Sequence, residues 1–436
     1  MAKRFHEFRD PIHQFVRVDS DERRVIDSHP FQRLRHIHQL AMTYLTYPGA
    51  THRRFEHSLG VMELAGRIYD TVTQPHNLPE QARRSVPERG SEEHGYWRRA
   101  LRIAALCHDM GHLPFSHAAE SELLPEGWDH ERLTTEIIRS APMQEIWSTI
   151  TPPVRAQDII KLAVGPKKLP DVAFKEWEEI LADIIVGDAF GADRMDYLLR
   201  DSYHLGVAYG SYDRHRLVDT LRILPRSDQD SEELSLGIEA GGLESAVALL
   251  FARYFMYKQV YFHPVRRIYD IHLKDFLKEW LKDGVFSTDL ERHIGLTDNE
   301  VLAGIAKAAS QHGAKGHTSA VRIATRRHFK LLYERNPSDH QRNPDSVPAL
   351  FTAAVDEFGA GRVRMDRSSP KVGLPDFPVL QNSGRIESSL NVSEAIRAIP
   401  GAVVDCIFVE RDVFAEAQRW QDANCEAIIL RSLGVE

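Results

Sequence analysis

Leu243–Val260 is the segment that most constrains the fold of this chain, because it is apolar almost all round its helical circumference. A helix without a polar face must be covered on every side, so we expect a buried central helix. Helical periodicity recurs in Ile180–Arg200 and Ile268–Leu281, and Trp97–His108 is a breaker-free apolar run that ends near Gly111. These patterns predict a mainly α fold.

The character of the sequence changes near residue 340. Asn336–Ser346 is polar and linker-like. Two strand-like runs and one helical run follow it: Arg362–Asp366, Val403–Val409 and Val413–Asn424. We therefore predict a helical core over residues 1–340 and a smaller α+β lobe over residues 341–436.

Composition restricts the class of protein. The formal net charge of the 436 residues is −8, so no overall basic field favours a long nucleic acid, and phosphate chemistry must depend on local Arg and Lys clusters. The three Cys form no CxxC pair and no even disulfide framework, which indicates a reducing compartment. Because there is no apolar leader and no long apolar run, we expect a cytoplasmic protein without a membrane partner.

His108 and Asp109 are adjacent at the end of an apolar helix, just before Gly111. Side chains at consecutive helix positions diverge by about 100°, so both can face one ion only near a helix end. A metal that activates water needs several N or O ligands and one open position. The pair therefore indicates a metal site, although an isolated His-Asp dipeptide is weak evidence.

The context of this dipeptide resembles the HD-domain phosphohydrolases. Four motifs carry the resemblance: RFEHSLG at Arg54–Gly60, LCHDMGHLPFSH at Leu106–His117, DHE at Asp129–Glu131 and DRMDYLLRD at Asp193–Asp201. The resemblance implies an HD-domain helical core, with its motif region at about residues 50–205. It implies one divalent metal ion whose ligands are His57, His108, Asp109 and Asp193.

Further motifs are similar to one branch of that superfamily, the deoxynucleoside-triphosphate triphosphohydrolases of the sterile-alpha-motif and HD-domain type. They are DPIH at Asp10–His13, FQRLRHIHQL at Phe31–Leu40, YPGATHRRFEHSLG at Tyr47–Gly60 and YHLG at Tyr203–Gly206. The bacterial relatives of that branch lack the extra N-terminal domain. The resemblance implies cleavage of a dNTP at the α-phosphorus to a deoxynucleoside and inorganic triphosphate. Zn, Mn, Fe, Ni, Co or Mg would suit the ligands, with additional Mg accompanying the nucleotide.

Site residues follow from the same resemblance. His130 and Glu131 match the family's catalytic His-Glu pair, and an imidazole titrates near neutrality, as a general acid or base requires. The catalytic set implied is His130, Glu131 and His112. The phosphate contacts implied are Arg54, His112, His117, Arg194 and Tyr197. Gln39 and Leu40 match residues that read the deoxyribose, with Asp201 and Tyr261 completing that pocket.

Two stripes with i, i+4, i+8 spacing support this pocket. The first is Asp193, Tyr197 and Asp201, beside which Asp196 and Arg200 are expected to be solvated or ion-paired.

The second stripe is Arg253, Tyr257 and Tyr261, within the apolar helix. A buried Arg needs a partner, which a triphosphate or a carboxylate could provide. The family often has His at the position of Tyr257.

Asp27, Gln32 and Arg35 match an allosteric guanine-nucleotide site that, in the animal branch, assembles a tetramer. An activating nucleotide and a homo-oligomer, dimer or tetramer, are therefore implied. The alternative is that this FQRLR segment is simply a helix packed on the core.

Two other functions stay open: a nuclease or phosphodiesterase of the same superfamily, and a nucleotide-sensing protein without activity. The sugar-reading Gln39 and the acidic net charge favour a mononucleotide over a long polyanion.

Overall fold

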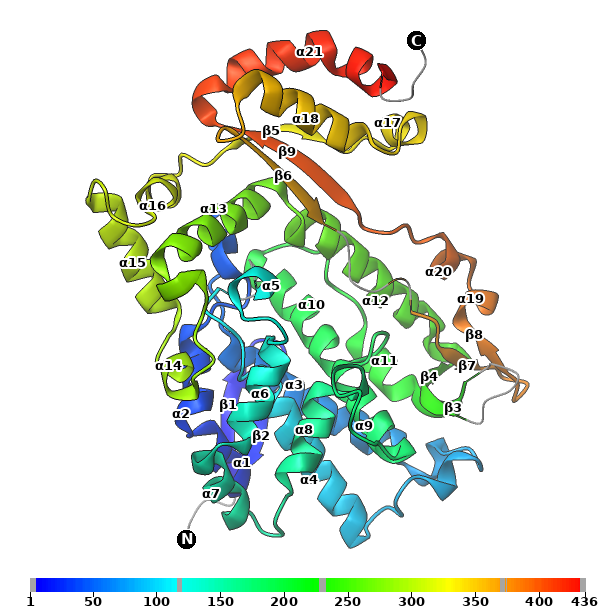
Figure 1. Ribbon diagram of the computed structural model, residues 1–436. Helices are drawn as coiled ribbons and strands as arrows, with labels where there is room; N and C mark the ends of the chain where they lie inside the picture. The colour runs from blue at the N-terminus through cyan, green and yellow to red at the C-terminus, as the bar shows by residue number, and fades with distance from the viewer. Residues whose placement is uncertain (1–4, 116–119, 227–232, 369–372, 374, 432–436) are drawn as a thin grey trace. The chain divides into compact units, whose positions relative to one another are not determined.

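The fold is described from a computed structural model that covers residues 5–115, 120–226, 233–368, 373 and 375–431. Figure 1 shows a mainly α chain with small sheets. The chain forms two compact units, each made of segments that are not continuous in sequence. Unit 1 comprises Met1–Met256, Phe286–Asn299 and Val372–Pro400, and unit 2 comprises the remainder. The boundary predicted near residue 340 falls inside unit 2, and the division at that residue stays a prediction.

Unit 1 holds the helices that carry most of the predicted site residues. Its helices are α1 (Ser20–Ile26), α2 (His29–Gln32), α3 (Arg54–Val72), α4 (Glu92–Cys107), α5 (Glu120–Leu123), α6 (His130–Arg139), α7 (Ala141–Thr149), α8 (Ala156–Val164), α9 (Glu176–Val186), α10 (Ala192–Leu205), α11 (Arg214–Thr220), α12 (Leu243–Met256), α14 (Leu290–Ile294), α19 (Ser389–Val392) and α20 (Glu394–Ala398). Its strands are β1 (Phe5–Asp10), β2 (Gln14–Asp19), β3 (Leu221–Pro225), β4 (Leu234–Glu239), β7 (Pro378–Leu380) and β8 (Ile386–Ser388).

Local signals explain where the central helices begin. The side chain of Ser91 accepts a hydrogen bond from the backbone N–H of His94 and so caps α4. Asp129 caps α6 in the same way, at 2.8 Å from the N–H of Arg132. Both caps start helices that end or begin at the predicted motifs.

The strands of unit 1 form two sheets. β1 and β2 make an antiparallel hairpin whose turn is closed by Asp10, which accepts hydrogen bonds from the backbone N–H groups of Ile12 and His13. The second sheet has the order β3-β4-β7-β8, with β4 and β7 parallel and the other pairs antiparallel.

Unit 2 contains a small α+β assembly. Its elements are α13 (Pro264–Trp280), most of α15 (Asp298–Ser310), α16 (His317–Ala324), β5 (Lys330–Glu334), α17 (Pro337–Arg342), α18 (Ser346–Phe358), β6 (Val363–Ser368), β9 (Val404–Val409) and α21 (Phe414–Arg431). The antiparallel sheet has the order β5-β9-β6, and α18 and α21 pack on one face of it (Figure 1). Val347, Leu350, Val363 and Ile407 belong to the core between them.

Three expectations are corrected. Leu243–Val260 is helical to Met256 and then forms a π-helical turn over Tyr257–Tyr261, and α12 is not covered on every side, because Phe255 is 43% exposed. Ile180–Arg200 is two helices, α9 and α10, separated at Gly187–Gly191.

The third correction concerns the expected linker at Asn336–Ser346. It contains α17, and its Asn343 is buried, where its side-chain amide donates to the carbonyl of Ile429. This segment is therefore packed inside unit 2.

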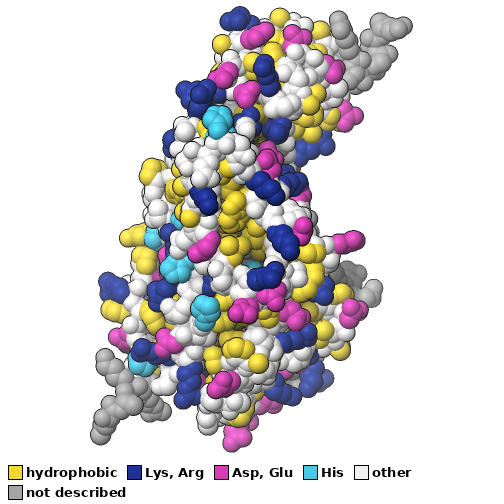
Figure 2. All heavy atoms as spheres, turned by 60° about the vertical axis from the view of Figure 1, so that its left-hand side comes forward, with side chains coloured by type: hydrophobic (Ala, Val, Ile, Leu, Met, Phe, Trp, Pro, Cys, Tyr) yellow, Lys and Arg dark blue, Asp and Glu magenta, His cyan; other side chains and the backbone are white. Residues whose placement is uncertain are grey.

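Cationic and acidic side chains are interspersed on the face shown in Figure 2, in keeping with the modest net charge. Among the described helices, none is both long and apolar enough to cross a membrane.

Candidate active site

The three helices α3, α4 and α10 of unit 1 bring the predicted metal ligands together. His57 lies on α3, His108 and Asp109 follow α4, and Asp193 is in the first turn of α10. His57 is fully buried, and His108 and Asp109 are nearly so.

The donor atoms of His57, His108 and Asp193 lie within 4.8 Å of one another. Oδ1 of Asp193 is 3.0 Å from Nε2 of His57 and 3.6 Å from Nε2 of His108. Asp109 borders the cluster, with Oδ1 at 3.3 Å from Nε2 of His108 and Oδ2 at 3.8 Å from Nε2 of His57. Arg54 neutralises Asp109 by an ion pair of 2.6 Å.

The tautomer of His108 provides a test of whether this cluster fits a metal ion. Nδ1 lies 2.7 Å from the carbonyl oxygen of Ala105, to which it donates. Nε2 is therefore left with its lone pair, and within the part of the chain that the structure describes no group forms a hydrogen bond with this buried atom. An orphaned imidazole nitrogen facing two carboxylates fits a divalent cation.

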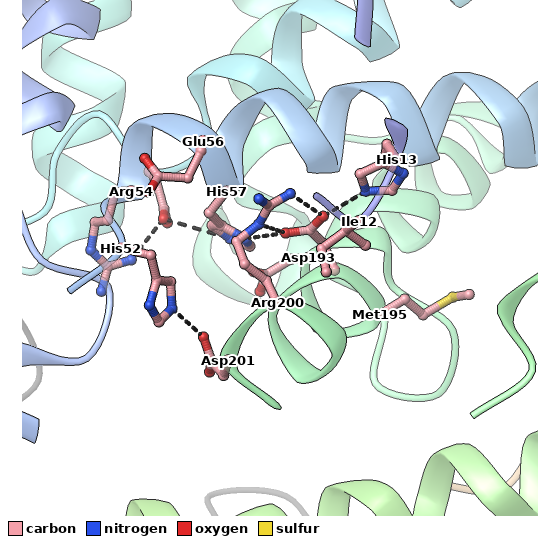
Figure 3. Close-up of polar contacts among 12 residues, drawn as sticks. Ile12, His13, His52, Arg54, Glu56, His57, Asp193, Met195, Arg200 and Asp201 are labelled. Atoms are coloured by element: carbon pink, nitrogen blue, oxygen red, sulfur yellow. Dashed lines mark hydrogen bonds and ion pairs between the residues drawn. The ribbon is translucent and has the colours of Figure 1, made fainter. Parts of the chain in front are cut away.

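A second layer of buried charge lies behind His57. Asp196 accepts from Nδ1 of His57 at 2.9 Å, from Nε2 of His13 at 2.7 Å, and from Arg200 through two nitrogens at 2.8 and 3.0 Å. Figure 3 labels these three partners. Arg200 also pairs with Asp10 at 2.7 Å. Asp196 and Arg200 are fully buried, so the expectation of an ion pair is confirmed and the solvated alternative is wrong.

Glycine makes this second layer possible. A Cβ at Gly60 would lie 2.1 Å from Oδ1 of Asp196 and 2.3 Å from Nη2 of Arg200. Only a residue without a side chain lets α10 approach α3 this closely.

The two carboxylates around His57 dominate its electrostatics. Burial alone would lower the pKa of His57, but hydrogen bonds with Asp193 and Asp196 outweigh it and raise the pKa to about 10. Without a metal ion, His57 is therefore an imidazolium held between two carboxylates.

His112 and His130 lie at the other end of the site. Their rings are stacked, with centroids 3.9 Å apart and planes at 15°. Nε2 of His112 is 3.0 Å from Oδ1 of Asp109, which connects this pair to the metal-binding turn. Burial, Arg54 and His130 together hold the pKa of His112 well below its usual value.

The carboxylate nearest to His130 is Glu120. Nδ1 of His130 is 2.7 Å from Glu120 and 3.2 Å from Glu131, which was expected to be its partner. Burial lowers the pKa of His130, but the hydrogen bond and charge of Glu120 outweigh it, and the pKa is raised. The sequence gives no signal for Glu120, because α5 is a four-residue helix without a recognisable motif.

Residues from both ends of the site line one cavity of about 370 Å³, although its described lining does not include His57. Predicted residues that line it are Gln39, Arg54, His108, Asp109, His112, His130, Glu131, Asp193 and Tyr197. Residues that were not predicted also line it: Ala163–Lys168, Asp183 and Val186–Asp188. In the sequence, the adjacent lysines Lys167 and Lys168 after the Gly165-Pro166 break are the feature that could have indicated this part of the lining.

Lys168 also belongs to the catalytic end. Its ammonium group lies 2.8 Å from Asp129 and 3.0 Å from Glu131. Glu131 is thus shared between Lys168, at its Oε1, and His130, whose Nδ1 is 3.2 Å from its Oε2.

Other predicted residues lie outside the described lining of this cavity. Arg194 donates to the carbonyl oxygens of Gly187 and Asp188 and so holds the segment before α10. Asp201 is 2.8 Å from Nε2 of His52 (Figure 3). Leu40 and Arg253 are buried in unit 1, Tyr257 and Tyr261 belong to unit 2, and His117 lies outside the described residues. Their substrate contacts stay predictions.

The residues of the predicted activator site are near one another. Arg35 donates to the side chain of Gln32 at 2.8 Å, and Gln32 donates to the carbonyl of Ile26 at 2.7 Å. Asp27 pairs with Arg23 at 3.2 Å. These contacts are compatible with an activating-nucleotide site and equally with a segment that only packs on the core, so the activator site stays a prediction.

Comparison with known proteins gives two family matches. Residues 54–185 match the HD domain, and residues 212–346 match the HD associated region.

The chain is 36% identical over 272 residues to the uncharacterized protein YwfO of Bacillus subtilis, covering 62% of this chain and 54% of YwfO. It is 30% identical over 364 residues to the deoxynucleoside triphosphate triphosphohydrolase SAMHD1 of Gallus gallus, covering 76% and 56%. The chain thus spans about half the length of these relatives. A crystal structure of a hypothetical protein from Aquifex aeolicus is similar with a TM-score of 0.77 and 32% identity, covering 95% of this chain and 99% of that one.

Proposed function

We propose, since this chain belongs to the HD-domain superfamily of phosphohydrolases, that it is a metal-dependent enzyme that hydrolyses deoxynucleoside triphosphates to deoxynucleoside and inorganic triphosphate. One observation carries the proposal: His108 and Asp193 of the metal-binding cluster, Asp109 beside them and the stacked His112–His130 pair line a single cavity of about 370 Å³. A cavity of this size suits one nucleotide.

His57, His108, Asp109 and Asp193 are the residues that would hold the ion. A bound divalent cation would supply Lewis-acid stabilisation of charge on the α-phosphoryl group. Arg54, beside Asp109, brings a fixed positive charge to the same place.

His130 is the proposed general acid. Water attacks the α-phosphorus, the bond between phosphorus and the 5′-oxygen breaks, and the leaving 5′-oxygen takes a proton from the imidazolium of His130. Glu120 keeps that imidazole protonated and oriented. His112, whose pKa is lowered, contacts the substrate in its neutral form.

Further residues that line the cavity are proposed to bind the nucleotide. Tyr197 and Gln39 offer a hydroxyl and an amide to the phosphates and sugar, and Lys167 and Lys168 add cations to the lining. We also propose that the protein is a homo-oligomer and that Asp27, Gln32 and Arg35 bind an activating nucleotide. Light scattering with and without a guanine nucleotide tests both points.

The direct test is incubation of the purified protein with each dNTP and Mn²⁺ or Mg²⁺, followed by separation of the phosphate products. Stoichiometric deoxynucleoside and triphosphate are expected. Release of monophosphate or pyrophosphate would overturn the proposal, and cleavage of cyclic nucleotides or nucleic-acid ends would favour the phosphodiesterase or nuclease alternative. The same assay with His130→Ala controls for contaminating phosphatase.

A further inference from the structure

The first turn of α6 touches the metal-binding turn backbone to backbone. A Cβ added to Gly111 would lie 2.1 Å from the carbonyl oxygen of His130 and 2.3 Å from the backbone nitrogen of Thr134. Gly111 therefore leaves no room for any side chain between the turn that follows α4 and the helix that begins at His130.

The hydroxyl group of Thr134 bridges this contact. Its Oγ1 accepts a hydrogen bond from the N–H of Gly111 at 3.0 Å and donates one to the carbonyl of His108 at 3.2 Å. Thr134 is fully buried and lies one helical turn after His130. A threonine hydroxyl can donate once and accept, and here it does both within one turn of the chain.

The two segments that this hydroxyl joins carry the two halves of the site. His108 directs its orphaned Nε2 at the metal cluster, and His112, at the end of the same turn, stacks on His130 at 3.9 Å. The distance from the metal cluster to His130 is thus set where the turn and α6 meet.

We infer that the Thr134 hydroxyl is a positioning group, which holds His130 at its working distance from the metal cluster. The inference rests on the proposed function, because it assigns the acid of that reaction a specific support. Displacement of a catalytic group by about 1 Å can lower a rate by about 10²-fold.

Thr134→Val removes the hydroxyl at nearly constant volume. We expect kcat to fall by about 10- to 100-fold, while KM for dNTP stays within about threefold and metal content is unchanged. Thr134→Ser restores the hydroxyl and should restore kcat.

Thr135→Val is the matched control. This neighbour is also buried, but its hydroxyl donates to the carbonyl of Glu131 in its own helix, at 3.0 Å. It should retain wild-type kcat. Should Thr134→Val fail to fold, Thr134→Ala replaces it with the same expectation.

A second readout does not depend on activity. The His130 ring-proton signals in the NMR spectrum, assigned by their loss in His130→Gln, should shift in Thr134→Val and not in Thr135→Val, because the stacking on His112 changes. Wild-type kcat in Thr134→Val, or loss of metal together with activity, overturns the inference. A wild-type protein inactive on every dNTP would instead count against the proposed function, and the NMR comparison would still decide the role of Thr134.

Discussion

The two ends of the site, around His57 and around His130, are stabilised by different interactions. Around His57, the supporting groups are the fully buried ion pair of Asp196 and Arg200, which Asp10 and His13 contact in turn. Around His130, the side chains of His130, Glu120 and Glu131 are 17, 15 and 22% exposed, and the neutral hydroxyl of Thr134 joins the helix to the metal-binding turn.

The difference matches the two tasks. Buried ion pairs are costly to break and hold a geometry that must not change. A partly exposed histidine beside carboxylates can exchange a proton with its surroundings, as an acid must in every turnover. Both ends offer grouped ligand atoms, since His112, Glu120 and His130 also lie within 4.8 Å of one another. At the His57 end, the fully buried carboxylate of Asp196 supports a donor histidine, an arrangement that is typical of metal sites.

The strongest way to break this comparison is to remove Asp193. Asp193→Ala deletes the only carboxylate among the three grouped donors around His57, and we expect loss of stoichiometric metal and of all metal-dependent turnover. Elemental analysis of the dialysed protein measures the first effect. A variant that keeps one ion per chain would show that Asp193 is not a ligand.

His130→Ala addresses the opposite end. Turnover should fall by about 10²- to 10⁴-fold, the usual contribution of a general acid, with metal content unchanged. Steady-state kinetics and metal analysis on the same sample check this. Unaltered kcat would remove His130 from the chemistry.

Asp196→Asn tests the buried support behind the metal. It leaves Arg200 with Asp10 as its remaining carboxylate, so we expect a loss of about 3–5 kcal/mol in the free energy of unfolding and about 10- to 100-fold weaker metal binding. Urea denaturation and metal titration measure the two effects.

Asp70→Asn is the control for this substitution. Asp70 pairs with Arg98 at 2.7 Å with both side chains 39% exposed, and its loss should lower the free energy of unfolding by less than about 1 kcal/mol. Equal effects of the two substitutions would refute the distinction between buried and exposed pairs.

The pH dependence of metal binding gives the smallest and most graded effect. Metal must displace the proton on Nε2 of His57, whose raised pKa of about 10 favours the protonated form at neutral pH. The neutral fraction grows tenfold per pH unit below that pKa, so the apparent metal affinity should rise by about tenfold per unit between pH 6.5 and 8.5. Calorimetric titration in buffers of low metal affinity checks the slope, and a flat profile would contradict the imidazolium assignment.

The sequence predicted the mainly α fold, the HD-type core and the convergence of His57, His108 and Asp193, because long motifs carry that information locally. The sequence predicted that Asp196 is solvated or ion-paired, but not that it contacts His57. Spacing along α10 shows which residues share a face of the helix, and not which residues pack on that face. Glu120 could not be anticipated, because its role depends on how the chain returns to α6.

The partial exposure of α12 shows a similar limit. An apolar circumference indicates that a helix can be buried, but the number of neighbours that cover it is a property of the assembled chain. The Phe255 side chain is exposed to solvent although its neighbours in the sequence are mostly apolar.

The turn between β1 and β2 determines how long a stretch of chain must be kept together for the proposed metal site to form. Asp10 and His13 reach Arg200 and Asp196 from the far N-terminal side, while the HD domain match covers only residues 54–185 and stops before Asp193. A fragment excised at those limits would lack Asp193, a proposed ligand, and the residues Asp10, His13, Asp196 and Arg200 that support His57, another proposed ligand. The proposed metal centre therefore depends on a much longer stretch of chain than the family match, and recombination within residues 10–200 is expected to yield proteins that do not bind the ion.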